Sequence, residues 1–371
     1  MEVESIISLY NKNDRESSEF SSFIIKKIFS PITHIKQNDP VDVKTKNELL
    51  SFVDTMHDNR FDQTFRLLNG LSSDEFDKYS AILKNSFEIT NFINNKEINI
   101  PSSSLIRHLY QFRLINQNFP NAKNILEVGP GSGYLTCLLS LNDCSVITFE
   151  VTKALFIWQH ILLKKLNYIS DIDNISFDKK SETFTADFDP NKVIQFPWWN
   201  IPKVSSFNNL DLIVANHVLC EMHPASRKHL LKIANQSGGV PIFLEGHGLS
   251  NYVPFDDVIF EFAEENYFLS WQKCSPKKQI YCFEKSTKTK INYLVNRYFL
   301  TKIPFLKLAH KEMKGVYFHI DNFIRFLITR SKPNKKLGDI SLDEMKNLYS
   351  KYDCSIEDAN RSSRSLKTLG L

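Results

Sequence analysis

The sequence I-L-E-V-G-P-G-S-G-Y occupies Ile125 to Tyr134 and joins a strand-like run to a helix-compatible run. The strand-like run covers residues 124–128, and the helix-compatible run covers residues 134–141. Three of the chain's 11 glycines alternate between these runs, at Gly129, Gly131 and Gly133. A strand, a glycine turn and a helix together bring backbone N–H groups and a helix N-terminus close to a ligand. The stretch therefore predicts a ligand-binding turn in an α/β fold.

The spacing of the glycines separates three kinds of nucleotide-binding turn. The dinucleotide pattern G-x-G-x-x-G would place its last glycine at position 134, which holds Tyr134. A P-loop ends in Gly-Lys followed by Ser or Thr, and that ending is absent here. The pattern that remains is E-x-G-x-G-x-G, in which Glu127 stands two residues before the first glycine.

Strand-like and helix-like segments alternate through the middle of the chain. The strand-like segments are 124–128, 145–149, 176–185, 211–215 and 240–244. A helix over residues 105–117 precedes the first strand and begins with serines that can cap it. This alternation predicts a doubly wound, mostly parallel sheet. We divide the chain into a helical N-terminal cap (1–100), a ligand-binding core (101–285) and a basic helical C-terminal extension (286–371).

Polar residues follow three of the predicted strands. Glu150 closes the second strand, 17 positions after Gly133, where a carboxylate of a nucleotide-binding sheet accepts hydrogen bonds from ribose hydroxyls. The fourth strand runs into N-H-V-L-C-E-M-H, Asn216 to His223, and the fifth runs into Glu245-Gly246-His247. Because ligands lie at the carboxyl ends of parallel strands, two histidines and a glutamate of the fourth-strand segment are expected to face a reacting group.

Over about residues 124–248 the chain resembles class I S-adenosylmethionine (SAM)-dependent methyltransferases. More narrowly, it resembles the bacterial putative sugar O-methyltransferases of surface-polysaccharide gene clusters. The narrower resemblance rests on I-L-E-V-G-P-G-S-G-Y-L, on V-T-x-A-x-x-x-W-Q-x-x-L after Glu150, and on F-P-W-W at Phe196 to Trp199. It implies a Rossmann-like core, SAM as the cofactor, and a sugar hydroxyl on a nucleotide sugar or a growing glycan as the methyl acceptor.

The resemblance also implies roles for individual residues. Glu127 would hold the amino-acid end of SAM, Asp187 would bond the adenine amino group, and Phe188 would lie against the adenine ring. Asp189 competes with Asp187 for that role. The tryptophan loop, Gln195 to Pro202, either stacks on a flat or sugar-like face or fills a gap in the core. The expected cofactor-binding residues are Glu127, Gly129, Gly131, Gly133, Tyr134, Glu150, Val151, Asp187, Phe188 and Asn216.

A sugar hydroxyl is weakly acidic, so its methylation benefits from a base at its proton. The candidate catalytic residues are His217, Glu221, His223 and His247. We rank His217 and Glu221 first, because they closely follow the fourth strand. Asp256-Asp257 could hold a divalent metal that lowers the hydroxyl pKa, but adjacent acids on one loop are weak evidence for a metal site, and we expect no metal.

Two other functions are weighed against sugar methylation. The segment 273–336 is rich in Lys, Arg and aromatic residues, which suits a protein or nucleic-acid acceptor. The N-P-P-Y-type tetrapeptide of amino-directed nucleic-acid methyltransferases is absent, since A-N-H-V follows the fourth strand, so a nucleic-acid partner is not expected. A non-catalytic SAM-fold binding module is the third possibility, and the intact glycines, Glu127 and Glu150 favour cofactor binding.

Composition sets the compartment expected for the protein. The chain is 42% hydrophobic and 24% charged, as in ordinary globular proteins. Its six cysteines form no C-x-x-C pair and have no His partner at zinc spacing. The N-terminus carries acids where a signal peptide needs basic residues, and no window approaches the apolar length of a membrane span. We therefore expect a cytoplasmic protein.

Overall fold

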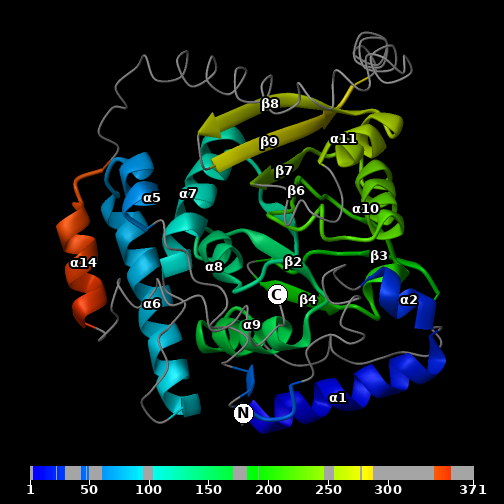
Figure 1. Ribbon diagram of the computed structural model, residues 1–371, viewed down its shortest axis with the longest axis horizontal. Helices are drawn as coiled ribbons and strands as arrows, with labels where there is room; N and C mark the ends of the chain where they lie inside the picture. Colours follow the sequence, from blue (N-terminus) through cyan, green and yellow to red (C-terminus); the bar gives the residue numbers. More distant parts are fainter. Residues whose placement is uncertain are drawn as a thin grey trace, which may run out of the picture.

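The protein folds around one central sheet that is covered by helices on both faces (Figure 1). The computed structural model describes residues 3–21, 23–29, 43–46, 48–49, 61–94, 103–169, 182–190, 192–245, 255–275, 278–286 and 338–351. Within these ranges no helix is long and apolar enough to cross a membrane.

The central sheet has seven strands in the order β4-β2-β1-β6-β7-β9-β8. Their bounds are β1 Asn124–Val128, β2 Ser145–Glu150, β4 Val193–Pro197, β6 Leu212–Val214, β7 Ile242–Glu245, β8 Tyr267–Ser275 and β9 Lys278–Lys285. Strand β9 runs antiparallel to both of its neighbours, and every other pairing is parallel. From the central pair β1 and β6, further strands are added outward on both sides. The expected doubly wound, mostly parallel α/β sheet is confirmed.

Helices cover the two faces of this sheet and enclose a core on each side. On one face, α7 (Ser103–Asn118), α8 (Tyr134–Ser140) and α9 (Lys153–Lys165) pack on residues such as Ile125 and Val146. On the other face, α10 (Pro224–Gln236) and α11 (Phe255–Glu264) pack on Leu126 and Ile147. Because both faces are covered, every residue of β2 is buried, as parallel strands require.

The third strand of the sheet is not where the sequence analysis placed it. Residues 176–181 lie outside the described part of the chain, and β3 (Phe184–Ala186) pairs only with β5 (Val204–Phe207) in a separate two-stranded sheet. The place beside β2 belongs to β4, which includes the first part of the tryptophan loop. Phe196 of β4 packs against Phe149 of β2 with ring centroids 6.1 Å apart, so burial of aromatic area selects this pairing.

The tryptophans after β4 fill the core rather than presenting an exposed platform. Trp198 and Trp199 are 2% and 1% exposed. Trp199 packs edge-on against Tyr10 of α1 (Val3–Phe20), with ring centroids 4.9 Å apart. The indole Nε1 of Trp198 donates to Asp14 Oδ1 at 2.7 Å. The loop thereby joins the N-terminal helix to the edge of the sheet.

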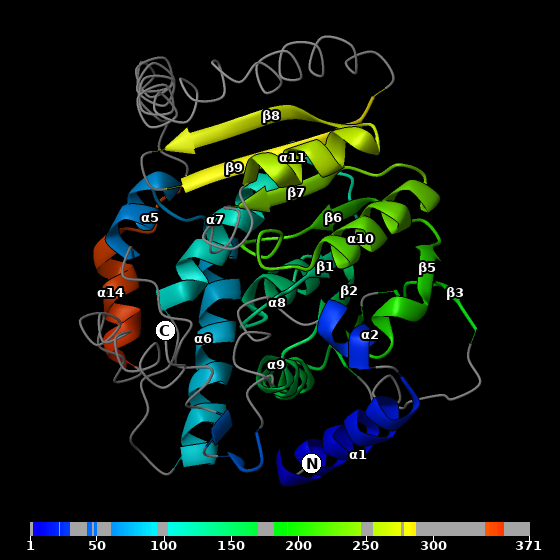
Figure 2. The same ribbon diagram turned by 45° about the vertical axis from the view of Figure 1, so that its right-hand side comes forward.

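The hairpin of β8 and β9 was not predicted, because the sequence after residue 248 shows no alternation of strands with helices. An antiparallel hairpin needs no crossover helix, and this one completes the sheet beyond β7 (Figure 2). Most of the basic segment 286–371 lies outside the described residues. The helical extension predicted for it therefore stays a prediction.

The long helix that precedes α7 in the chain has a capped start and is joined to the core by an arginine. Helix α6 (Ser73–Asn94) begins with a capping box: the Ser72 hydroxyl accepts from the Glu75 N–H at 3.2 Å, and the Glu75 carboxylate accepts from the Ser72 N–H at 2.9 Å. Arg113 of α7 donates to Glu75 at 2.7 Å and joins this helix to the core.

Three further helices lie in the N-terminal and C-terminal regions: α2 (Phe23–Ile28), α5 (Phe61–Leu68) and α14 (Leu342–Lys351). Lys346 of α14 lies 3.3 Å from the Asp62 carboxylate of α5. The hydroxyls of Tyr79 and Tyr349 share a hydrogen bond. Helix α14 therefore belongs with α5 and α6 (Figures 1 and 2). The three-unit division at 100 and 285 stays a prediction.

Candidate functional site

The glycine turn between β1 and α8 uses backbone conformations that disfavour side chains. Gly129, Gly131 and Gly133 have φ values of +64°, +60° and +73°. A Cβ at Gly129 would lie 2.9 Å from Val218 Cγ2, and a Cβ at Gly133 would lie 2.7 Å from Gln159 Cγ. Glycine is therefore needed at both positions for its conformation and for close packing. This explains why the scarce glycines concentrate here.

Glu127 lies beneath the turn and is 3% exposed. Its Oε2 accepts from the Thr136 hydroxyl of α8 at 2.6 Å. Burial raises the pKa of Glu127 to about 7, and the nearby Glu150 contributes to the rise, whereas the Thr136 bond opposes it. The carboxylate faces the helix that the turn begins. Its predicted contact with the amino-acid end of SAM stays a prediction.

Glu150 closes the turn against the end of β2. Its Oε1 accepts from the Thr152 N–H at 2.7 Å, and its Oε2 accepts from the Gly131 N–H and from Gln159 Nε2, both at 3.3 Å. The side chain is 2% exposed, and burial raises its pKa to about 7. A carboxylate offers about four lone-pair positions, and the Thr152 side chain also hydrogen-bonds this carboxylate, so its acceptor positions are largely engaged. A ribose would have to share or replace these bonds.

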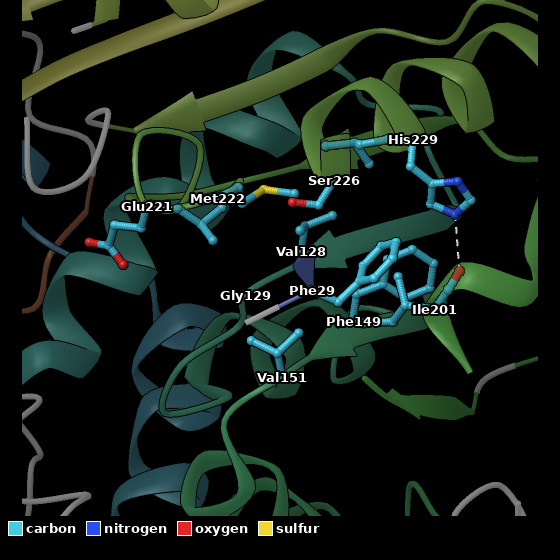
Figure 3. A pocket seen from close by; sticks show the side chains of 12 residues that line it. Phe29, Val128, Gly129, Phe149, Val151, Ile201, Glu221, Met222, Ser226 and His229 are labelled. Carbon is cyan, nitrogen blue, oxygen red and sulfur yellow. Dashed lines mark hydrogen bonds between the residues drawn. The ribbon is translucent and has the colours of Figure 1, made fainter. Parts of the chain in front are cut away.

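A pocket with about 510 Å³ of empty space, part of it open to solvent, lies at the carboxyl ends of β1, β2 and β6 (Figure 3). These strand ends meet where the strand order reverses, which is the usual ligand position in open α/β sheets. Most of the lining side chains are apolar. The lining residues are Phe29, Val128, Gly129, Phe149, Val151, Ile201, Val218, Glu221, Met222, Ser226, His229 and Leu230.

The sequence analysis missed most of this pocket. Phe29 follows α2, about 100 residues before the glycine turn, and packs edge-on against His229 of α10 with ring centroids 5.6 Å apart. The Nε2 of His229 lies 3.0 Å from the Ile201 carbonyl oxygen, and burial lowers the pKa of His229. Residues 226, 229 and 230 have helical spacing and offered a signal, but only tertiary packing brings Phe29 here.

The four predicted catalytic residues lie in four different settings. His217, at φ +56°, donates its backbone N–H to the Glu245 carbonyl at 3.0 Å at the end of β6. Glu221 lines the pocket, and Figure 3 shows its carboxylate pointing away from Val128 and Phe149. The Nδ1 of His223 accepts from the Ala225 N–H at 3.1 Å and caps α10. His247 lies outside the described residues.

An arginine holds the segment after β6 in place. Arg227 is 1% exposed and donates to both oxygens of Glu261, at 2.5 and 2.6 Å. Its Nη1 donates to the carbonyls of Leu219 and Met222 at 3.1 and 2.5 Å. Because a bidentate arginine pair fixes both position and orientation, the segment that carries His217 and Glu221 is anchored to α10 and α11.

The remaining predicted residues lie in different environments. The exposed Asp187 accepts from Asn208 Nδ2 at 2.7 Å, and Phe188 packs on Phe207 with ring centroids 5.8 Å apart, so neither lines the pocket. Their position follows from β3 lying outside the main sheet. Asn216 Oδ1 accepts from the Glu245 N–H at 2.7 Å. Tyr134 is fully buried, and Val151 lines the pocket.

Two further observations concern the acidic residues. The carboxylate of Glu245, which ends β7 and is 1% exposed, accepts from Gln111 Nε2 of α7 at 2.6 Å. Within the described ranges, no group of three or more His, Cys, Asp or Glu side chains could hold a metal ion. Asp257 lies at the start of α11, and the side chain of Asp256 is outside the described part.

No family model and no curated protein matches this chain. Solved structures do match it, at low identity. Magnesium protoporphyrin IX methyltransferase (ChlM) of Synechocystis PCC 6803 with bound SAM is 8% identical, with a TM-score of 0.35 over 58% of this chain and 99% of that one. The pyocyanin biosynthetic protein PhzM is 12% identical, with a TM-score of 0.35 over 50% of this chain and 58% of that one.

The ribosomal protein L11 methylase of Lactobacillus delbrueckii subsp. bulgaricus is 17% identical, with a TM-score of 0.33 over 49% of this chain and 80% of that one. Likenesses at this level concern the fold alone and carry no information about ligand or substrate. The strand order and the strand directions by themselves show the fold: the chain has a Rossmann-like, doubly wound α/β sheet in which β9 is antiparallel to its neighbours.

Proposed function

We propose that the protein is a SAM-dependent O-methyltransferase that methylates a sugar hydroxyl, on a nucleotide sugar or a surface glycan. The proposal for the cofactor rests on the glycine turn and its two buried carboxyls. The proposal for the acceptor rests on the resemblance of the glycine, V-T-x-A-x-x-x-W-Q-x-x-L and F-P-W-W motifs to sugar O-methyltransferases.

The residues at the turn fit the chemistry of SAM. The apolar pocket beside Gly129 and Val151 suits a flat nucleoside ring. Glu150 stands at the end of β2, where a ribose would lie. Glu127 and Glu150 are buried acids with raised pKa values, and a cationic ligand favours their ionised forms. This turn can therefore accept a ligand that combines an apolar ring, hydroxyl groups and positive charge.

When bound, SAM supplies a methyl group on a sulfonium, which the acceptor oxygen displaces in line. The chain's own part is to align the acceptor and to take its proton. We propose that His217 or Glu221 accepts that proton. Both residues follow β6, at the same edge of the sheet as the turn. Transfer of the hydroxyl proton to either side chain raises the nucleophilicity of the oxygen as the methyl–sulfur bond breaks.

A single contact supports this arrangement more than any other. The position of a Cβ on Gly129 is only 2.9 Å from Val218 Cγ2. Val218 lies between His217 and Glu221, so the segment with the proposed base packs directly on the proposed cofactor turn. Arg227 holds that segment in place. A cofactor turn and an acceptor-side base are thus neighbours, as methyl transfer requires.

Calorimetry with S-adenosylhomocysteine (SAH), the demethylated product, tests the cofactor. We expect saturable binding to the wild type and loss of binding in Gly131→Arg, because a long side chain at φ +60° disturbs the turn. Absence of SAH and SAM binding to the folded wild type, or unchanged binding to the folded variant, would contradict the assignment.

The proposed base is tested by replacing His217 and Glu221 with alanine together. We expect methyl transfer from radiolabelled SAM to a panel of nucleotide sugars to fall about 10²–10⁴-fold, because the acceptor loses its proton acceptor. SAH affinity should stay within a few-fold of the wild type. Ser341→Ala is the control: it removes the hydroxyl that accepts from the Glu344 N–H at the start of α14, costs about 1 kcal/mol of stability, and should leave turnover intact. Undiminished turnover in the double variant would remove both residues as the base.

A further inference from the structure

A row of polar side chains crosses the sheet beneath α8 and α9. Glu127 of β1 lies directly opposite Thr148 of β2, which lies opposite Gln195 of β4. Their exposed fractions are 3%, 0% and 2%. Central parallel strands covered on both faces are normally apolar, and buried polar groups are costly unless they are hydrogen-bonded. The presence of these polar side chains in a buried part of the sheet therefore requires a structural or functional explanation.

Gln159 of α9 connects the row to the glycine turn. It is fully buried. Its Nε2 donates to the Gly131 carbonyl at 2.6 Å and to Glu150 Oε2 at 3.3 Å, and its Oε1 accepts from Gln195 Nε2 at 3.3 Å. Because an ionised carboxylate and a carbonyl can only accept, these partners determine which way the amide points. Gln195 is held in turn by His160, with Nδ1 and Oε1 3.0 Å apart.

The residue before Gln159 acts on the next peptide of the turn. Trp158 Nε1 donates to the Ser132 carbonyl at 3.2 Å, so two consecutive side chains of α9 hold two consecutive carbonyls. In a planar trans peptide, the N–H points opposite to the carbonyl. With the Gly131 carbonyl held by Gln159, the Ser132 N–H points away from that side chain. The orientation of the turn's donors is thus set from α9.

We propose that Gln159 is a positioning residue of the cofactor site: it orients the Glu150 carboxylate and the Gly131 peptide so that the turn accepts a ribosyl ligand. The inference rests on the proposed function and deepens it. The position requires one group that donates to Glu150 and accepts from Gln195. Leucine can do neither, and an ionised glutamate would place a third buried carboxylate against Glu150.

The test compares Gln159→Glu and Gln159→Leu with the wild type in SAH binding, by calorimetry between pH 5.5 and pH 8.5. At pH 8.5 we expect both variants to bind SAH at least tenfold more weakly. As the pH falls, Gln159→Glu should approach wild-type affinity, because a protonated carboxyl regains a donor, whereas Gln159→Leu should stay weak. Circular dichroism at each pH serves to check that both variants are folded.

Wild-type affinity in both variants, or a ratio of Gln159→Glu to wild-type affinity that does not change with pH, would overturn the proposal. A second measurement does not depend on SAH. Amide hydrogen exchange across residues 129–134, at one pH, should be at least several-fold faster in Gln159→Leu than in the wild type, and equal exchange would overturn the positioning role. If the wild type fails to bind SAH while exchange in the variant is faster, the proposed function fails and the positioning of the turn stands.

Discussion

Replacing Gly133 with alanine is expected to weaken SAH binding at least tenfold and to destabilise the fold. Gly133 has φ +73° and ψ 8° at the start of α8, and the strain of a side chain in this region is about 1–3 kcal/mol. The new Cβ would also lie 2.7 Å from Gln159 Cγ. Gln159 would have to move, and its bonds to Gly131 and Glu150 would weaken. Calorimetry and thermal unfolding measure the two effects.

Gly238→Ala is the matched control for this variant. Gly238 also has a positive φ, +98°, but a Cβ there would meet nothing within 4 Å. It should therefore lower the unfolding temperature while leaving SAH affinity at the wild-type value. If Gly133→Ala binds SAH as tightly as Gly238→Ala does, the turn tolerates a side chain and its close contact with α9 is not needed for binding.

The ligand-free protein is expected to lose stability as the pH rises from about 5 to 8. Burial raises the pKa of both Glu127 and Glu150 from 4.5 to about 7. Between these values the folded protein binds more protons than the unfolded chain, so the free energy of unfolding falls as the pH rises. The loss is complete at about pH 8, one unit above the folded pKa, and is on the order of 3 kcal/mol for each carboxyl.

Thermal unfolding at fixed ionic strength, measured at pH 5, 6, 7 and 8, checks this expectation. Glu127→Gln keeps an acceptor for the Thr136 hydroxyl but cannot ionise. It should therefore flatten the pH dependence between pH 5 and pH 8 by about half. A variant whose unfolding temperature falls with pH as steeply as that of the wild type would show that Glu127 is not the titrating group.

The glycine turn was predicted well because its causes are local. The first strand ends at Val128 as expected, the helix begins at Tyr134, and all three glycines adopt positive φ values. A strand-like run, a turn that tolerates no side chain and an apolar helix each carry their signal in adjacent residues. The acid at the end of β2 could be placed for the same reason.

The third strand was misplaced because strand pairing is not local. Residues 176–185 and Val193–Pro197 both have strand character, and the chain between β2 and β6 can supply only one strand next to β2. The packing of Phe196 on Phe149, together with the Thr148–Gln195 register, places the second segment next to β2. The segment that carries Asp187 and Phe188 follows β3, which pairs with β5 instead of β2, and neither residue lines the pocket. Their contact with an adenine ring stays a prediction.

The sequence by itself determined the α/β class and the position of the turn, because glycine conformation and hydrophobic alternation act between near neighbours. Only the tertiary structure decided what surrounds that turn. Phe29, His229 and Gln159 come from three different helices or their ends. The contact of Phe29 with His229 and the bond of Gln159 to Gly131 depend on packing. The hydrogen-bond partners of Gln159 and His229 lie nine or more residues away along the chain, so packing brings them together and no local spacing encodes them.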